Sequence, residues 1–343
     1  MLYDVIIVGA GQAGIAVSQK LKKENIKHLM IDSSERVGDQ WRARYHSLVL
    51  FTPRDYSSLP DLKMKGKNNT YPTKDEVADY LEQYVEHFNL PIALGIQVTL
   101  IEKEKNMFLL HTSNGVYQSK KVVIASGAFK DPFIPLSLQG SQIKHIHSSG
   151  YKNINDIKGK KVLIVGGGNS GVQIASELAL TKEVYLAVSQ KIKYMPLTLF
   201  NKSIFYWINK LKFLHAGKDT IKGKIMQKRQ DPIFGYESKV LINKGKIKVK
   251  PRVDQLINNK VIFSDKSELE IDTILWCTGF KSDYNWLRIE GALTSEGLPL
   301  HKRGISPVEN LFFIGLPWQY QRGSSLICGV GLDAAHLVNN MMS

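Results

Sequence analysis

The feature that most constrains this chain is a glycine-rich loop that occurs twice, each time between a strand-like run and a helix-like run. VIIVGAGQAG covers residues 5–14, and VLIVGGGNSG covers residues 162–171. Both have the spacing GxGxxG, and both precede sequences with helical periodicity, IAVSQKLKKENI and VQIASELALTK. A strand, this loop and a helix form the dinucleotide-binding unit of Rossmann folds. The sequence therefore predicts two such units.

The glycines of each loop have separate roles. The first makes the tight turn, the second lets the backbone approach a pyrophosphate, and the third lets the helix pack closely on the strand. The helix N-terminus then presents free N–H groups to phosphate. We expect cofactor contacts from Gly9, Gly11, Gln12, Ala13 and Gly14 in the first loop, and from Gly166, Gly168, Asn169, Ser170 and Gly171 in the second.

The next strand of each unit indicates which dinucleotide is bound. KHLMID ends at Asp32 and EVYLAVS ends at Ser189, each 23 residues after the first glycine of its loop. An acid at this place hydrogen-bonds a ribose 2′-OH and repels a 2′-phosphate. Asp32, followed by Ser33, therefore predicts FAD or NAD at the first site. Ser189, Gln190 and Lys191 tolerate a 2′-phosphate, so we expect NADPH, NADH or both at the second.

The positive charge of the chain is concentrated in its middle. The 343 residues carry a formal net charge of +15, and residues 151–270 contain 23 Lys and Arg against 10 Asp and Glu. Such a segment suits an anionic partner, whether a phosphate cofactor, a nucleic acid or an acidic lipid. No zinc-finger or RNA-binding signature accompanies the charge, so we expect no nucleic-acid partner. No histidine cluster has the spacing of metal ligands, so we expect no metal.

Cysteine content and hydropathy indicate a cytoplasmic protein. Cys277 and Cys328 lie far apart, with no CxxC motif, which argues against a disulfide framework and against dithiol chemistry of the thioredoxin-reductase type. No apolar run approaches the roughly 20 residues of a membrane-spanning helix. Nothing before Val5 resembles a signal peptide.

Several further motifs occur in a fixed order after the first loop. They are ERVGDQWRARYHSLVLFTPRDYSSLP (35–60), YPTKDEVADYLEQYVEHFNLP (71–91), ASG (125–127), HSSGY (147–151), CTGF (277–280), IGLPW (314–318) and GSSLICGVGLDAAH (323–336). In order and spacing the chain resembles the flavin-containing monooxygenase superfamily, the class B flavoprotein monooxygenases. Within it, the chain is most similar to the small bacterial CzcO-like branch.

The resemblance implies an α/β fold in which one Rossmann-like dinucleotide-binding domain is inserted into another. The FAD domain would be discontinuous, covering 1–150 and 271–343, and the NAD(P)H domain would cover 151–270. VVIASG (122–127) and TILWCTGF (273–280) would be the crossing points. By motif match, the resemblance adds these residues to the cofactor sites: Gly38, Gln40, Trp41, His46, Val98, Ala125, Gly127, Thr278 and Gly279.

The activity that the resemblance implies is oxygenation. NAD(P)H would reduce FAD, reduced flavin would react with O2 at its C4a position, and the peroxide adduct would oxygenate a small sulfide, amine or ketone. In such enzymes an Asn lies near the reactive face of the flavin, where this chain has Phe51, followed by Thr52. Phe51 cannot donate a hydrogen bond to a peroxide. An NAD(P)H oxidase or quinone-type reductase without oxygen transfer therefore stays open.

A second departure concerns the family fingerprint FxGxxxHSxxY. His147, Ser148 and Tyr151 are present, but Ser141 and Ile143 replace the Phe and the Gly. We interpret 141–151 as a linker between the domains and His147 as a structural residue, because a hydrogen-bonded linker histidine requires no special chemistry.

Residues 197–218, LTLFNKSIFYWINKLKFLHAGK, have apolar residues at helical spacing, surrounded by lysines. The apolar positions are Leu197, Phe200, Ile204, Ile208 and Leu211. A basic amphipathic helix can lie on a membrane surface, pack on its own domain or close a substrate channel; we favour the latter two. A homodimer stays open, as does an accessory role beside a cation transporter, which the name of the branch suggests.

Overall fold

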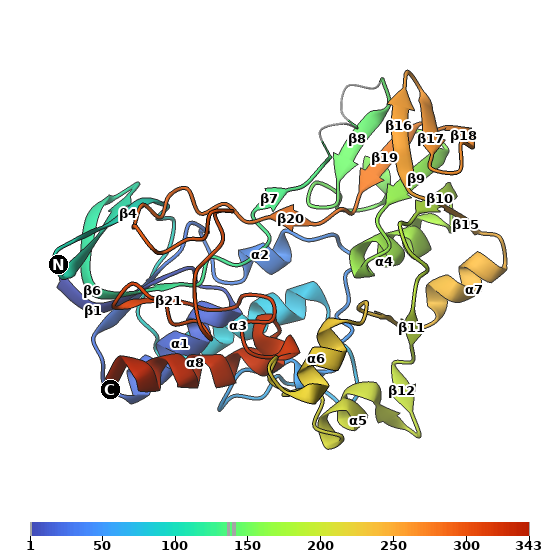
Figure 1. Cartoon of the computed structure of the whole chain (residues 1–343). Helices are drawn as coiled ribbons and strands as arrows, with labels where there is room; N and C mark the ends of the chain where they lie inside the picture. The colour runs from blue at the N-terminus through green and yellow to red at the C-terminus, as the bar shows by residue number, and fades with distance from the viewer. Residues whose placement is uncertain (1, 136–137, 139–141, 343) are drawn as a thin grey trace.

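Two sheets organise the chain, one mixed and one parallel, and each contains the strand that leads into one of the glycine-rich loops (Figure 1). The computed structural model describes residues 2–135, 138 and 142–342. In Figure 1 the first sheet lies at the left and the second at the upper right, with most helices below and between them.

The first sheet has seven strands, and its central strand β1 carries the run YDVIIV. Val5, Ile6 and Ile7 are buried on both faces, as expected for a parallel strand covered by other elements. β1 pairs in parallel with β2 and β6, in the order β3-β2-β1-β6-β5-β4, and β21 also pairs with β6. The strands are β1 (Leu2–Val8), β2 (His28–Ile31), β3 (Ile92–Ala93), β4 (Val98–Glu104), β5 (Met107–Thr112), β6 (Gly115–Ile124) and β21 (Leu311–Phe313).

Three helices cover one face of this sheet and share one apolar core. They are α1 (Gln12–Lys23), α3 (Lys74–His87) and α8 (Ile327–Met342). Thr73 caps α3 by accepting from the N–H of Glu76, whose carboxylate accepts the N–H of Thr73 in return. The shorter α2 (Asp39–Arg42), η1 (Arg54–Tyr56) and η4 (Arg322–Ser325) lie in the connections. In this arrangement α1 begins directly after the first loop, and the start of α8 lies near it.

Helix α8 buries an acidic side chain, Asp333, neither of whose oxygens has a hydrogen-bond partner at normal distance within the described residues. Burial raises the pKa of Asp333, and the Ser324 hydroxyl and the Arg303 guanidinium offset only part of that rise. The folded chain therefore favours the protonated acid. The preference of the folded chain for the protonated Asp333 therefore contributes to stability at low pH. This contribution is lost as pH rises through the pKa of Asp333 in the folded chain.

We expect Asp333→Asn to stabilise the protein more at about pH 8 than at about pH 4, because the difference opens as pH rises above the ordinary pKa of an aspartic acid. Leaving a buried polar group unpaired costs about 1–3 kcal/mol, and the amide avoids ionisation at this site. Urea unfolding of both proteins across this range measures the difference, with the exposed Asp219→Asn as a control. A stability difference that does not change with pH would contradict the assignment.

The second sheet has five parallel strands in the order β15-β10-β9-β19-β8. α4 (Asn169–Leu178) and α7 (Glu237–Asn243) pack near one face, and an antiparallel three-stranded sheet packs on the other. The five parallel strands are β8 (Lys144–His147), β9 (Lys161–Val165), β10 (Glu183–Ala187), β15 (Ile247–Lys250) and β19 (Thr273–Trp276). The antiparallel strands are β16 (Val253–Ile257), β17 (Lys260–Phe263) and β18 (Glu268–Glu270). The short helix η3 (Ile154–Asp156) precedes β9.

The sheets divide the chain at places that differ from the sequence-based boundaries. β8 and β19 complete the second sheet, although 1–150 and 271–343 would assign both to the first domain. The connection between the sheets is the antiparallel pair β7 (Asp131–Pro132) and β20 (Phe280–Lys281), seen between them in Figure 1. We therefore propose that the inserted domain extends from β7 to β20.

The linker interpretation of residues 141–151 is wrong for 144–147, which form β8. This edge strand has four residues, and its pairing with β19 across more than a hundred residues leaves no local signal. Ser141 lies outside the described residues. His147 does have a structural environment, since its Nε2 lies 2.9 Å from the carbonyl oxygen of Gly279 and its Nδ1 2.9 Å from the Ser149 hydroxyl. Burial lowers the pKa of His147.

Residues 197–218 form a hairpin and a short helix rather than one long helix. The hairpin is β12 (Thr198–Leu199) with β13 (Lys202–Ser203), and α5 covers Ile204–Lys210. The helical expectation is wrong before α5 because Phe200 and Asn201 have positive φ and close the hairpin, and Ser203 caps α5. α6 (Ile221–Gln227) and the parallel pair of β11 (Tyr194–Met195) and β14 (Ile233–Phe234) complete this region.

Candidate active site

The first glycine-rich loop has the geometry that a pyrophosphate requires. Gly9 has a φ of +106°, and a Cβ on Gly14 would lie 1.9 Å from the Gly9 carbonyl oxygen. A Cβ on Gly11 would meet no atom of the described residues within 4 Å. α1 begins directly after Gly11, so its first N–H groups have no partners within the helix. Loop and helix end thus border open space lined by N–H donors, which fits a dinucleotide phosphate.

Asp32 lies at the end of β2 and ties the loop to that strand. One carboxylate oxygen accepts the N–H of Ala10 at 2.6 Å, and the other accepts the N–H of Ser34 at 2.8 Å. A carboxylate has about four lone-pair sites, so acceptor capacity remains for ribose hydroxyls. These residues fit the ribose of a dinucleotide.

A narrow hollow beside Asp32 brings together many of the residues expected at the FAD site. Gly11, Gln12, Asp32, Gly38, Gln40 and Trp41 line it, with Ala10, Ser34, Arg36, Val37, Asp39, Leu81 and Leu94. Ser33 is exposed nearby, and Ala13 is buried in α1. Sequence reasoning missed Leu81 and Leu94, because apolar residues at ordinary core spacing carry no signal for a cofactor.

The second loop repeats the geometry of the first. Gly166 has a φ of +122°, and a Cβ on Gly171 would lie 2.0 Å from the Gly166 carbonyl oxygen. A Cβ on Gly168 would again have no neighbour within 4 Å in the described part of the chain. α4 starts at Asn169 and includes Ser170, so this loop fits a second dinucleotide. Ser189, Gln190 and Lys191 are exposed just beyond the carboxyl end of β10.

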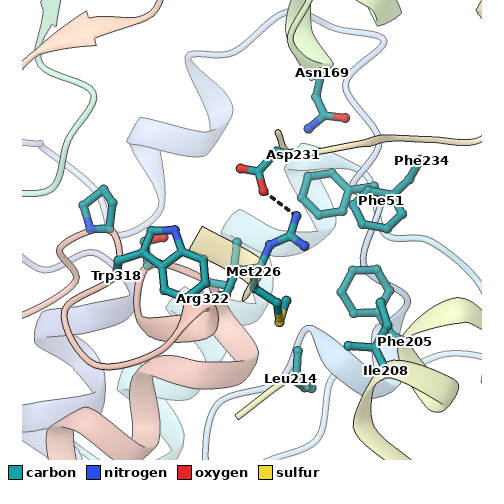
Figure 2. A pocket seen from close by; sticks show the side chains of 13 residues that line it. Phe51, Asn169, Phe205, Ile208, Leu214, Met226, Asp231, Phe234, Trp318 and Arg322 are labelled. Carbon is teal, nitrogen blue, oxygen red and sulfur yellow. Dashed lines mark ion pairs between the residues drawn. The ribbon is translucent and has the colours of Figure 1, made fainter. Parts of the chain in front are cut away.

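A cavity of about 160 Å³ lies between the two dinucleotide-binding units (Figure 2). The first unit contributes Phe51, Pro317, Trp318 and Ser325, and α4 contributes Asn169. The remaining lining residues are Phe205, Ile208, Leu214, Met226, Asp231, Phe234, Arg322 and Leu326. The cavity therefore borders the start of α4 at the second loop and side chains of the first unit, and its walls are mainly apolar.

Phe51 forms part of an aromatic wall in this cavity. Its ring stacks on Phe234 with centroids 4.9 Å apart at 11°, and Phe205 lies 6.2 Å away (Figure 2). Thr52 is buried behind it, with its hydroxyl 2.8 Å from that of Ser57. Of the two residues expected at the reactive face of the flavin, Phe51 thus lines the cavity and Thr52 forms a hydrogen bond within the protein.

An ion pair spans one side of the cavity. Arg322 of η4 and Asp231 of the segment before β14 lie 2.8 Å apart, as the dashed line in Figure 2 shows. A backbone hydrogen bond from the Lys218 N–H to the Tyr320 carbonyl, 2.6 Å, joins the segment before α6 to the segment before η4. Sequence reasoning missed both charged residues, because their pairing depends on the tertiary fold.

The other expected cofactor residues lie outside the two cavities, although the Ala125 backbone packs against Gly9 of the first loop. Ala125 donates its N–H to Val8 at the end of β1, and Gly127 follows it with a φ of +72°. Thr278 donates to the Phe133 carbonyl, next to Gly279. His46 is exposed with its N–H bonded to the Lys152 carbonyl, and Val98, the first residue of β4, is half-buried against the core of the first sheet. None of these six residues lines either described cavity.

Comparison with known proteins decides the family. The model of the pyridine nucleotide-disulphide oxidoreductase family matches residues 6–315. The chain belongs to this family. A CzcO-like uncharacterised oxidoreductase of Geobacillus kaustophilus (strain HTA426) is 46% identical over 100% of this chain and 99% of its own. A probable indole-3-pyruvate monooxygenase of Arabidopsis thaliana is 28% identical over 87% of this chain and 81% of its own.

A solved flavin-containing monooxygenase from Stenotrophomonas maltophilia has the same fold, with a TM-score of 0.83 at 22% identity over 99% of this chain and 98% of that one. The expected α/β fold with Rossmann-type units is confirmed, and so is the expected similarity to CzcO-like oxidoreductases. This chain is an oxidoreductase of the pyridine nucleotide-disulphide oxidoreductase family.

The family name includes disulphide chemistry, but the two thiols of this family member are not placed for it. Burial raises the pKa of Cys277 to about 12 and that of Cys328 to about 11. A thiol must ionise to attack a disulfide, so both groups are held in the unreactive form. Cys277 packs in the core of the second sheet and Cys328 beside Phe205. Among the described residues, no group of histidine, cysteine and acidic side chains could hold a metal.

Proposed function

We propose that the chain is an FAD-dependent NAD(P)H monooxygenase. The first loop, Asp32 and the hollow around Trp41 would hold FAD, and the second loop with Ser189, Gln190 and Lys191 would hold NADPH or NADH. O2 would be the co-substrate, and a small sulfide, amine or ketone would be oxygenated. The two widely spaced cysteines support action in a reducing cytoplasm, and the CzcO-like relatives support a bacterial one.

The observation that carries this proposal is the apolar cavity between the two dinucleotide-binding units. When bound, a flavin accepts hydride from the nicotinamide and passes electrons to O2. The chain contributes the surroundings: Phe51, Phe205 and Phe234 keep water away from the reacting atoms. Asn169 and Arg322 supply polar groups that can orient a bound molecule. Catalysis by this arrangement requires no acid–base triad from the protein.

The test uses purified flavin-loaded protein, NADPH, isotopically labelled O2 and methyl phenyl sulfide. We expect NADPH oxidation to yield a sulfoxide that carries one labelled oxygen atom, with the other appearing in water. Hydrogen peroxide should fall as sulfoxide rises. Repetition with an amine and a cyclic ketone covers the other substrate classes. Peroxide equal to the NADPH consumed, with no labelled product from any of the three, would contradict oxygen transfer.

A second candidate, an NAD(P)H oxidase or quinone-type reductase, is favoured by the surroundings of Phe51. Its ring contacts two other phenylalanines and offers no hydrogen-bond donor to an oxygen species. In that case the same two cofactors would act without oxygen transfer to an organic substrate.

We expect Phe51→Asn to reduce the share of NADPH electrons released as peroxide. A hydrogen bond to a charged oxygen is worth about 1.5–3 kcal/mol, so breakdown of the oxygen adduct should slow by about tenfold or more. Peroxide per NADPH, measured with and without methyl phenyl sulfide, checks this. Phe51→Leu is the matched control, because it removes the ring without adding a donor. Equal peroxide yields from both variants would contradict the role of Phe51.

We expect Lys191→Ala to weaken NADPH binding about tenfold and NADH binding little, since the loss of one charge contact to the 2′-phosphate costs about 1.4 kcal/mol. Flavin reduction rates at varied nucleotide concentration measure both affinities. Lys193→Ala, two residues along the exposed segment, is the control. Equal effects on the two nucleotides would remove Lys191 from the phosphate site.

A further inference from the structure

Residues 197–230, here called the basic segment, carry a strong and unneutralised positive charge. They contain eight cationic side chains and one acidic one, Asp219. Throughout the described chain, no salt bridge joins any of the eight to a carboxylate. The cations are Lys202, Lys210, Lys212, Lys218, Lys222, Lys224, Lys228 and Arg229.

Large apolar side chains are exposed among these cations. Phe200 and Ile221 are each 81% exposed, and Leu211 is 57% exposed. Phe200 is unusual in its backbone as well as in its exposure. It lies at the tip of the β12–β13 hairpin with a φ of +49°, a conformation that aromatic residues rarely adopt. The fold therefore holds an aromatic ring in solvent at a position where Asn or Gly would be less strained.

The exposed apolar residues belong to one continuous surface. The rings of Phe200 and Trp207 are 6.1 Å apart, and the Trp207 indole donates to the Leu199 carbonyl at 2.9 Å. One helical turn after Trp207, the Leu211 carbonyl accepts from the Lys222 ammonium at 2.8 Å, next to Ile221. Figure 1 shows β12, α5 and α6 together at the lower edge of the molecule.

The opposite side of the basic segment packs around the central cavity. Phe205, Ile208, Leu214 and Met226 face the central cavity (Figure 2). The outward apolar residues therefore are not the edge of the same core. They form a second apolar surface, ringed by lysine.

We propose that the outward face of the basic segment docks on the surface of an anionic lipid bilayer. Lysines around exposed aromatic and aliphatic side chains match a bilayer surface, where the cations meet lipid phosphates and the apolar groups enter the headgroup boundary. Within the described residues no helix is long and apolar enough to span the bilayer, so the contact is peripheral. This inference goes beyond the proposed reaction and does not depend on it.

Other occupants fit this face less well. A two-fold pair of copies would set the same cluster of cations against itself, which like-charge repulsion opposes. A nucleic acid would neutralise the lysines but would leave Ile221 and Leu211 without an apolar environment. The anionic lipid surface satisfies both the charge and the exposed apolar groups.

The test is sedimentation of the flavin-loaded full chain with vesicles, without nucleotide, so that it is independent of any reaction. One set is phosphatidylcholine, and the other contains phosphatidylglycerol as a minority lipid. We expect binding to the anionic vesicles at about 0.1 M salt, little binding to the neutral ones, and loss at about 0.5 M salt. Protein that stays in the supernatant with anionic vesicles at low salt would overturn the proposal.

Two variants of the basic segment separate the contributions of charge and apolar contact. Replacing Lys202, Lys210 and Lys212 by Gln should lower the affinity for anionic vesicles roughly a hundredfold. Phe200→Asn with Ile221→Ser keeps the charge and suits the turn, and should lower affinity about tenfold or more. The matched control replaces three lysines away from the basic segment by Gln: Lys248 of β15, Lys260 of β17 and Lys266 of the turn between β17 and β18. Equal losses in the control and the first variant would overturn the proposal, and flavin content verifies folding.

Discussion

Gly11→Val is expected to yield a folded protein that retains no flavin. The backbone at Gly11 has a φ of −75° and a ψ of −177°, an extended conformation that valine adopts readily. A Cβ there meets no described atom within 4 Å, so the side chain enters only the space assigned to the pyrophosphate. Displacing that group loses several charge-assisted hydrogen bonds of about 1.5–3 kcal/mol each, and FAD affinity should fall at least about a thousandfold. Absorbance at the flavin bands relative to protein measures the loss.

The control for this prediction is Gly14→Ala, in the same loop. Its Cβ would lie 1.9 Å from the Gly9 carbonyl oxygen, so the substitution forces α1 away from β1. It should lower the stability of the apoprotein by about 1–3 kcal/mol or more, whereas Gly11→Val should leave it nearly unchanged. Urea unfolding of the flavin-free proteins distinguishes the two. A yellow, fully loaded Gly11→Val protein would refute the FAD site.

The dinucleotide-binding loops could be predicted from the sequence because their geometry is local. Each loop needs three glycines within six positions and a polar residue at the end of the next strand, so all of the information lies within about thirty residues. The open space beside Gly11 and the close approach at Gly14 are direct consequences of that spacing.

The central cavity could not be predicted in the same way. Its aromatic wall joins Phe51 to Phe205 and Phe234, and its ion pair joins Asp231 to Arg322. These contacts depend on how the inserted domain packs against the first one. One sequence contains no periodicity or spacing that records such a pairing.

The errors in the sequence analysis have a common physical cause. A periodicity of apolar residues continued through 197–203, but the hairpin turn at Phe200 and Asn201 interrupts the helix by backbone conformation. The edge strand β8 likewise depends on its pairing with β19, which follows it only after most of the inserted unit. Local patterns fail where a turn or a distant partner determines the structure.

Gly168→Val is expected to prevent nucleotide binding at the second loop without affecting the flavin. The flavin should stay bound but should no longer be reduced by NADPH or NADH. The backbone at Gly168 is extended, with a φ of −79° and a ψ of 179°, and a Cβ there has no described neighbour within 4 Å. Valine would block the second loop just as it blocks the first, and nucleotide affinity should fall at least about a hundredfold. Anaerobic mixing of the yellow protein with either nucleotide measures the rate of flavin bleaching.

Chemical reduction of the same variant supplies the decisive comparison. Dithionite should bleach its flavin as fully as that of the unsubstituted protein, because Gly168 lies in the second sheet unit and the FAD residues lie in the first. Loss of flavin from this variant would mean that the second loop also contributes to the FAD site. Normal reduction by NADPH would mean that the nicotinamide cofactor approaches the flavin without using this loop. Only a yellow protein that dithionite reduces and NADPH does not reduce would assign one dinucleotide to each loop.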